Sequence, residues 1–327
     1  MLDAHQLNVF VAAAKTLNFT AAARQLHMTQ PSVSQHIQAL ETHFDMPLFI
    51  RSGRHLTLTA AGEMLLPMAQ ELVQLSHNIE ESMESLKGEI FGHLFVGCST
   101  TVGKYVLPFL LAEFMRRHPK VEASCYVTSR HHAMKMLCEG DVHVALASAR
   151  EFYKEVEYRK IITDPVILIV PLSHPWAEKG EIEPEELLDA HFILREEGSG
   201  TRSVTQEGLK KLGIELSDLK TTLTLGNSEA IAFSVQEGIG VSFVSQMVVS
   251  RLVNKKVAKI KVRGLNLQQD IYIGRISGRP ATRAQMAFWD FLTHPDNIVL
   301  QQLTAVSQTG AWPSLPTIEE IAVETAV

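Results

Sequence analysis

Amide and hydroxyl side chains gather around residue 30 in a pattern suited to hydrogen bonding with the edges of DNA bases. Ser and Gln are uncharged, so they can hydrogen-bond to base edges in the major groove without the need to neutralise a charge. Two arginines follow further along the chain, where cationic side chains could bind backbone phosphates. The candidate DNA-contacting residues are Thr20, Thr29, Gln30, Pro31, Ser32, Ser34, Gln35, Gln38, Arg51 and Arg54.

Two short helices joined by a tight turn would position these side chains. The first is predicted over Ala21–Leu26, after the turn and capping residues Asn18 and Thr20. The second begins after Thr29, with proline in its first turn, where proline is tolerated. Its apolar face consists of Val33, Ile37, Leu40 and Phe44. The candidate contacts between residues 31 and 38 lie on the opposite face, which is the arrangement of a helix-turn-helix.

A hairpin is predicted next, with strands Leu48–Arg51 and His55–Leu58 and an arginine on each side of its tip. Such a wing could bind phosphates. The alternative is a helix bundle whose polar helix only faces water. The wing and its arginine pair, in register with the two helices, favour DNA binding over that alternative.

The N-terminal domain of LysR-type transcriptional regulators resembles this part of the chain. The resemblance is carried by the run NFTAAARQLHMTQPSVSQHIQALETHFDMPLFIRSGRHLTLTAAGE, in which turn, recognition helix, wing and the start of the next helix follow in order. It covers about the first 85 residues. It implies a regulator that binds double-stranded DNA at an operator with dyad-related half-sites.

A long helix is predicted from Thr59 to Leu86, with apolar residues repeating in sevens. These residues are Leu65, Leu72, Ile79 and Leu86, with Met68 and Leu75 between them. Sustained heptads indicate a helical partner, so we expect a homodimer or a dimer of dimers, that is, a homotetramer. Packing of this helix against its own domain is the alternative. Lys87, Gly88 and Gly92 predict a hinge after it.

After residue 92 apolar strands alternate with helices, which is typical of an α/β domain with a parallel sheet. The first set of strands is Leu94–Cys98, Val121–Val127 and His143–Ala147, with helices over Tyr105–Arg117 and Met134–Glu139. The second set is Val166–Val170, His191–Leu194, Thr222–Leu225 and Val241–Val244. The strand Asp270–Ile276 and the helix Ala281–Phe291 are expected to return to the first set, through crossovers near Thr163–Pro165 and Gly264–Gln269.

This predicts two lobes, and the arrangement resembles periplasmic solute-binding proteins and the effector domain of the LysR family. The predicted fold class is therefore α/β: a winged helix-turn-helix, a long linker helix and a two-lobed effector domain. The predicted domains are residues 1–62 for DNA binding, 63–92 for the linker and hinge, 93–164 with 268–297 for lobe I, 165–267 for lobe II, and 298–327 for a C-terminal tail. Both a docking role and disorder are compatible with the sequence of that tail.

Hydroxyls after three strands should converge between the lobes, because ligands bind at the carboxyl ends of strands. The candidate effector-binding residues after these strands are Ser99, Thr100, Thr101, Ser148, Gly198, Ser199 and Thr201, and Ser228, after the next strand, is a further candidate. Hydroxyls at helix N-termini can hold a small anion. The family resemblance implies the same cleft, with Thr101, Ser148 and Thr201 carried over by position. The alternative is that these residues only cap their helices.

Other site chemistries are not supported by the sequence. Gly198–Thr201 lacks the ending of a phosphate-binding loop, and no catalytic set is identifiable, so we expect neither an enzyme nor a bound cofactor. Cys125, His131, His132 and Cys138 have no metal-ligand spacing, so no metal is expected. A small-molecule binding protein without a DNA-reading role is the alternative function.

Composition agrees with a multidomain globular protein. The chain has 327 residues, 46% hydrophobic and 20% charged, with three cysteines and a net charge of −6. A negative net charge does not favour a protein that binds nucleic acid non-specifically through its overall charge. The prediction of DNA binding therefore rests on the pattern around residue 30. No secretory signal or membrane span is visible, so we expect a cytoplasmic protein, with RNA polymerase as a further candidate partner.

Overall fold

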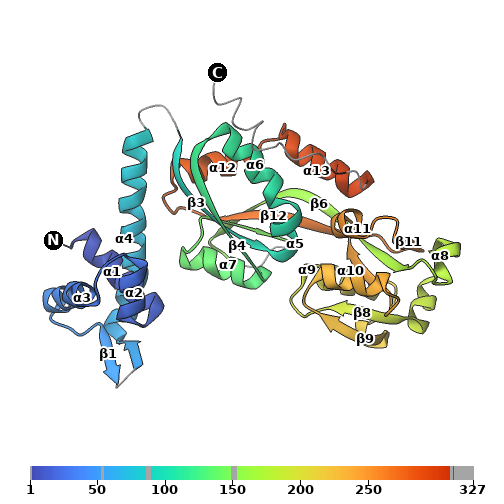
Figure 1. The fold of residues 1–327 in the computed structure, drawn as a ribbon, viewed down its shortest axis with the longest axis horizontal. Coiled ribbons are helices and arrows are strands. Elements are labelled where there is room, and N and C mark those ends of the chain that lie inside the picture. Colours follow the sequence, from blue (N-terminus) through green and yellow to red (C-terminus); the bar gives the residue numbers. More distant parts are fainter. Residues whose placement is uncertain (1, 53–54, 86–89, 149–152, 310–311, 313–327) are drawn as a thin grey trace. The chain divides into compact units, whose positions relative to one another are not determined.

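The computed structural model describes residues 2–52, 55–85, 90–148, 153–309 and 312. They belong to two compact units, which are taken in turn (Figure 1). Residues 1–88 with 280–282 form the first unit, and residues 89–279 with 283–327 form the second.

The first unit opens with a three-helix head and a hairpin. Its elements are α1 (Ala4–Thr16), α2 (Phe19–Gln25), α3 (Gln30–Phe44), β1 (Phe49–Ser52), β2 (His55–Leu58) and α4 (Ala60–Ser85). Asn18 caps α2 by accepting the N–H groups of Thr20 and Ala21, and Thr29 caps α3 by accepting the N–H of Ser32. The head is held together by a cluster of buried apolar side chains that includes Phe10, Val33, Ile37 and Leu40.

The linker helix α4 has two faces with different neighbours. Leu65 and Val73 pack against the apolar core of the head, together with the buried Ala69. The predicted placement of Leu65 on the partner-facing stripe is therefore wrong, because the first turns of α4 complete the head's own core. The exposed apolar stripe is instead Met64, Met68, Leu72, Leu75, Ile79 and Met83. Leu86, Lys87 and Gly88 lie outside the described residues.

The second unit is built on an eight-stranded sheet with the order β4-β3-β5-β12-β6-β11-β7, in which β10 pairs with β6, and on a separate parallel pair, β8 and β9. Its strands are β3 (Phe91–Ser99), β4 (Lys120–Thr128), β5 (Val144–Ala147), β6 (Val156–Pro171), β7 (Glu181–Ile182), β8 (His191–Arg195), β9 (Lys220–Leu225), β10 (Ser242–Ser245), β11 (Val257–Val262) and β12 (Leu267–Ile276). Gly92, predicted to lie in the hinge, is thus inside β3.

Two long antiparallel strands connect two lobes in this unit. β6 pairs with β12 from Val156 to Val166, and its later residues pair with β10 and β11. Lobe I contains β3, β4 and β5, and lobe II contains β7 to β11. The crossing point is marked by the pairing of Asp164 with Gln269, within the two predicted crossovers. The predicted two-lobed α/β fold class is confirmed by this structure.

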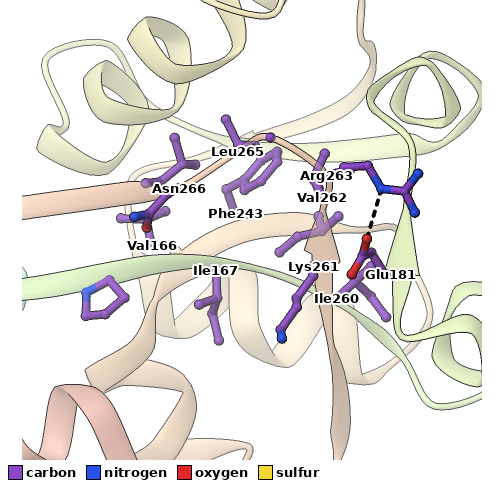
Figure 2. Close-up of a pocket in the computed structure, with 14 residues that line it drawn as sticks. Val166, Ile167, Glu181, Phe243, Ile260, Lys261, Val262, Arg263, Leu265 and Asn266 are labelled. Carbon is purple, nitrogen blue, oxygen red and sulfur yellow. Dashed lines mark hydrogen bonds and ion pairs between the residues drawn. The ribbon is translucent and has the colours of Figure 1, made fainter.

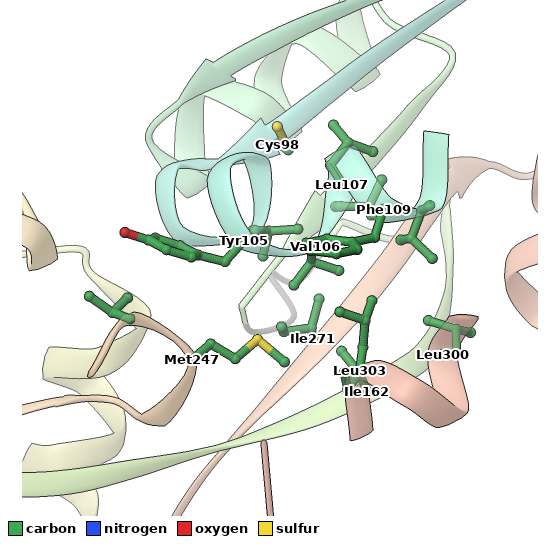
Figure 3. Close-up of a cluster of buried hydrophobic side chains, with 14 of the residues drawn as sticks. Cys98, Tyr105, Val106, Leu107, Phe109, Ile162, Met247, Ile271, Leu300 and Leu303 are labelled. Carbon is green, nitrogen blue, oxygen red and sulfur yellow. The ribbon is translucent and has the colours of Figure 1, made fainter. Parts of the chain in front are cut away.

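Helices cover the sheet and share one apolar core across the lobes. They are α5 (Thr100–Tyr105), α6 (Leu107–Arg117), α7 (Arg130–Glu139), α8 (Trp176–Lys179), η1 (Pro184–Asp189), α9 (Gly200–Lys210), η2 (Leu216–Asp218), α10 (Ser228–Gln236), α11 (Gln246–Leu252), α12 (Arg283–Thr293) and α13 (Ile298–Thr309). Figure 3 shows Val106 and Leu107 of lobe I in the same cluster as Met247 of lobe II and Leu303 of α13. The two lobes are therefore packed against each other.

Two helical segments differ from the prediction. The expected helix Tyr105–Arg117 is divided into α5 and α6 at Val106, because Pro108 has no N–H to continue the ladder of hydrogen bonds. The tail contains α13, whose Leu300, Leu303 and Val306 are buried. Trp312 follows α13, and its Nε1 donates a hydrogen bond to Ser250 Oγ at 3.0 Å. Neither β7 nor β11 was predicted.

Within the described part of the chain, no helix combines the length and the apolar character needed to cross a membrane.

Candidate functional site

The polar face of α3 is open to solvent. Thr29, Gln30, Pro31, Gln35 and Gln38 are exposed, and Ser32 and Ser34 are half-buried. The helix is anchored from behind, because Val33, Ile37 and Leu40 are fully buried in the head. Thr20 is exposed in the first turn of α2. The structure therefore presents these candidate contacts to solvent on an anchored helix pair, as insertion into a groove requires.

The wing carries one of its two candidate arginines within the described residues. Arg51 is exposed on β1, where it pairs with Leu56 of β2. Its guanidinium carbon lies 5.0 Å from the centroid of the Phe19 ring. Arg54 lies outside the described residues.

In lobe I, the candidate effector residues lie where two strands end. Ser99, Thr101 and Ser148 are at most 8% exposed, so their side chains are largely enclosed. Among the described residues Ser99 Oγ has no hydrogen-bond partner, although a buried hydroxyl normally has one. Thr100 Oγ1 donates to the carbonyl of Thr128 at 3.4 Å, so it is already used within the lobe.

In lobe II, the turn that begins α9 reaches across to lobe I. A Cβ placed on Gly200 would lie 2.3 Å from Ser148 Oγ and 2.6 Å from Ser148 O. Ser199 and Thr201 are buried beside this contact, and Thr201 Oγ1 donates to Gln269 Oε1 at 3.1 Å. The turns that carry Ser148 and Thr201 therefore meet. Gly198 is exposed, with the positive φ of 80° that glycine allows.

Arg195 starts the predicted turn 195–202 of lobe II but is not among the eight candidate effector residues. It ends β8, is 8% exposed, and donates through Nη1 to Ser228 Oγ. Its Nε and Nη2 bind both carboxylate oxygens of Glu196, at 2.7 and 2.8 Å. Burial pushes the pKa of Glu196 upward, but the hydrogen bonds and charge of Arg195 outweigh this and hold it below its usual value. A cation directly after a predicted strand was the signal that could have identified it.

A second set of contacts joins α5 of lobe I to the start of α10 in lobe II. Glu229 accepts hydrogen bonds from Lys104 Nζ and Tyr105 Oη, both at 2.7 Å. The bond from Lys104, followed by that from Tyr105, holds the pKa of Glu229 below its usual value despite partial burial. Burial and the bond to Glu229 raise the pKa of Tyr105. The turn that contains Ser228 is thereby held against lobe I.

The crossover itself contains a fully buried carboxyl group. Asp164 accepts hydrogen bonds from Ser245 Oγ at 2.5 Å and from the N–H of Met247 at 3.3 Å. Burial raises the pKa of Asp164 to about 7, although both hydrogen bonds act in the opposite direction. This residue lies in a predicted crossover, but its burial could not be inferred from its spacing.

A separate cavity of about 400 Å³ lies in lobe II, between β6, β11 and the segment 263–267 (Figure 2). Its lining is mainly apolar and includes Phe243 and Val262, while Glu181 and Arg263 are paired with each other at its edge. None of the eight candidate effector residues lines this cavity. The convergence of buried hydroxyls and a buried guanidinium makes the interlobe turns the better candidate for a polar ligand.

No group of three or more His, Cys, Asp or Glu side chains suited to a metal ion is found among the described residues.

Comparisons with known families match both units of the chain. The family model described as a bacterial regulatory helix-turn-helix protein of the lysR family matches residues 4–63. The model described as a LysR substrate binding domain matches residues 87–295. The head and the two-lobed unit thus each have a family assignment.

Similar proteins extend over nearly the whole chain. An uncharacterised HTH-type transcriptional regulator of Methanocaldococcus jannaschii is 34% identical over 286 residues, covering 87% of this chain and 96% of the relative. Full-length OxyR from Pseudomonas aeruginosa has the same fold, with a TM-score of 0.71 and 23% identity over 89% of this chain and 95% of that one. The CcmR regulatory domain of Synechocystis, solved in complex with 2-PG, is 26% identical, with a TM-score of 0.56 over 67% of this chain and 98% of that one.

Proposed function

Because the chain belongs to the LysR family of transcriptional regulators, we propose that it reads operator DNA with α3 and the wing and responds to a small anion bound between its lobes. Family membership establishes a DNA-binding transcriptional regulator with an effector-binding domain. The residue assignments and the chemistry of the effector are our proposal.

The exposed polar face of α3 is the observation that carries the DNA-reading assignment. Gln35 and Gln38 project from a helix whose opposite face is fully buried, so they can enter a major groove without unfolding the head. Arg51 would contact a phosphate from the wing. In this proposal Gln35 and Gln38 contact bases and Arg51 contacts the DNA backbone. Operator recognition requires both kinds of contact.

The apolar stripe of α4 supports pairing of two chains. Six large apolar side chains from Met64 to Met83 are exposed on one helix, and contact with a second copy would remove them from water. Two heads paired in this way would reach half-sites one turn of DNA apart, on the order of 34 Å. We propose a homodimer, or a dimer of dimers, on an operator with dyad-related half-sites.

The buried Arg195 supports an anionic effector. Its guanidinium lies beside Ser228, and the buried candidate residues Ser99, Thr101, Ser148 and Ser199 carry hydroxyls that can donate hydrogen bonds. A carboxylate or phosphate could replace Glu196 as the partner of Arg195. It could also accept from the Ser99 hydroxyl, which has no partner in the described part of the chain. That the similar CcmR regulatory domain was solved with 2-PG agrees with a small-molecule effector in this domain.

An effector can act only if it binds one lobe arrangement better than another. Glu229, which joins α5 to α10, and Gly200, which lies against Ser148, are the interlobe contacts that such binding would change. We propose that the change alters the spacing or bend imposed on DNA. The proposal needs no enzymatic activity, cofactor or metal, and it places the protein in the cytoplasm with RNA polymerase as a further partner.

Gel-shift assays with sheared genomic DNA test the DNA-reading role, with Gln25→Ala as a matched control for Gln35→Ala. Both glutamines are exposed, but Gln25 ends α2 and lies outside the candidate set. We expect retention of a specific fragment by the wild type and by Gln25→Ala, and its loss with Gln35→Ala. A wild type that retains no fragment would favour a small-molecule binding protein without a DNA-reading role.

A thermal-shift screen of carboxylates, sulfate-like anions and sugar phosphates tests the effector class. We expect an anion to raise the unfolding temperature of the wild type and not of Arg195→Ala. Stabilisation only by uncharged compounds would overturn the anionic assignment.

A further inference from the structure

The wing arginine rests on an aromatic ring that belongs to a different element. The guanidinium carbon of Arg51, on β1, is 5.0 Å from the centroid of Phe19, the first residue of α2. Phe19 is 8% exposed, and its ring meets Phe49 edge-on at 5.3 Å. Phe49 and Arg51 are two residues apart on β1, so they share one face of that strand.

This contact orients the guanidinium without neutralising it. A cation over a ring face is attracted by the ring's quadrupole, and its N–H donors remain available to an anion. Arg116 and Arg263, by contrast, are bound to carboxylates. No ion pair joins Arg51 to a carboxylate in the described ranges 2–52, 55–85, 90–148, 153–309 and 312. Its charge is thus held in place and left free for a ligand.

The position of the contact brings two candidate DNA-contacting segments together. Phe19 immediately precedes Thr20, which is exposed in the first turn of α2. Stacking on Phe19 therefore keeps the wing arginine at the start of the helix-turn-helix. An arginine already ordered there loses less conformational freedom when a phosphate binds.

We propose that Phe19 is a positioning residue for DNA binding, whose ring holds the Arg51 guanidinium ready for a phosphodiester group of the duplex. The inference rests on the proposed DNA-reading role of the head. Phe19 then contributes to DNA binding in addition to packing in the core of the head.

A double-mutant cycle with Phe19→Leu and Arg51→Ala tests the proposal on a random-sequence duplex over a series of salt concentrations. Arg51→Ala should weaken binding by about tenfold and lower the salt slope by about one. Phe19→Leu should weaken binding by about two- to fivefold, the size of an exposed cation–π contact. In the Arg51→Ala background the same leucine should change affinity by less than about twofold, since the contact is already lost.

Phe10→Leu is the matched control for a loss of core packing. Phe10 is fully buried and also contacts Phe49, but it belongs to α1, and among the described residues no cation–π contact joins it to Arg51. It should lower the thermal unfolding midpoint and leave DNA affinity of the folded protein unchanged. Arg51→Lys keeps the charge on an exposed site, so it tests the stacking even if Phe19→Leu fails to fold. It should weaken binding while the salt slope stays near the wild-type value.

An equal cost of Phe19→Leu in the wild-type and Arg51→Ala backgrounds would overturn the inference, as would wild-type affinity in Arg51→Lys. Wild-type affinity in Arg51→Ala would also overturn it and leave the DNA-reading role of α3 standing. A wild type that fails to bind any duplex would instead contradict the proposed function.

Discussion

The helix-turn-helix head and the candidate effector cleft both present hydroxyl and other polar side chains, but these side chains are exposed in the head and buried in the cleft. On α3 the glutamines are exposed, with the helix anchored only through its buried face. In the cleft Thr201 and Ser228 are buried and bonded to Gln269 and Arg195. An exposed surface can bind a large, rigid polyanion such as DNA. A buried site can bind a small ligand when the ligand replaces the hydrogen-bond partners of its side chains. The comparison indicates that head substitutions should act on affinity for DNA, and cleft substitutions on ligand binding and lobe packing.

The largest effect is expected where the lobes touch. Gly200→Ala places a Cβ within 2.6 Å of the Ser148 carbonyl oxygen, and backbone cannot swing away as a side chain can. We expect a loss of about 1–3 kcal/mol in the free energy of unfolding, together with loss of anion-induced stabilisation. Urea unfolding and thermal shift measure the two effects.

Gly226→Ala is the matched control, because no atom lies within 4 Å of the Cβ it would add. It also sits at a strand-to-helix turn in lobe II, between β9 and α10. Equal behaviour of the two alanine variants would show that the Gly200 contact does not shape the cleft.

Thr101→Val should reduce affinity for the stabilising anion by about 10- to 100-fold, the cost of losing a hydrogen bond to a charged group. Its affinity for DNA without the anion should stay at the wild-type value, because Thr101 is buried in lobe I. Isothermal calorimetry measures the first effect and gel shift the second.

Thr205→Val controls for the loss of a buried hydroxyl, since Thr205 Oγ1 donates only to the helix carbonyl of Thr201 among the described contacts. Normal anion binding by Thr101→Val would remove Thr101 from the cleft assignment.

The features that could be predicted from the sequence are those that depend on residues close together in the chain. Asn18 and Thr29 act on N–H groups two or three residues away, so the caps and the helices they begin were predictable. The bond between Arg195 and Ser228 joins the end of β8 to the start of α10, so it depends on tertiary packing. Leu65 was misplaced for the same reason, since its neighbours belong to the head core.

The helix in the tail could also have been predicted from the local sequence pattern. Leu300, Leu303 and Val306 recur at helical spacing and are all buried, which predicts α13 once the segment is examined for periodicity. The candidate effector turns were found because they follow predicted strands. Their meeting across the lobes needed the observed approach of Gly200 to Ser148.

A pH-dependent effect on stability is expected at the crossover. Burial raises the pKa of Asp164 to about 7, so between pH 4 and 7 the folded state binds this proton more tightly than the unfolded state. The stability it contributes is therefore present at low pH and is lost as pH rises through about 7. Relative to Asp164→Asn, the wild type should lose at most about 1.4 kcal/mol per pH unit in this window.

Urea unfolding at pH 5 and pH 8 measures this difference, with the exposed Asp189→Asn as control. A constant gap between the wild type and Asp164→Asn at both pH values would contradict the burial-driven shift.

Competition binding of Gln35→Ala tests the central claim most directly, namely that α3 reads base edges. The fragment retained from genomic DNA and a random duplex of equal length are titrated against one labelled probe at fixed salt. The account predicts a loss of about 1–3 kcal/mol on the retained fragment, little change on the random duplex, and wild-type behaviour in Gln25→Ala. An equal loss on both duplexes would contradict it, because Gln35 would then contribute to DNA binding without reading sequence.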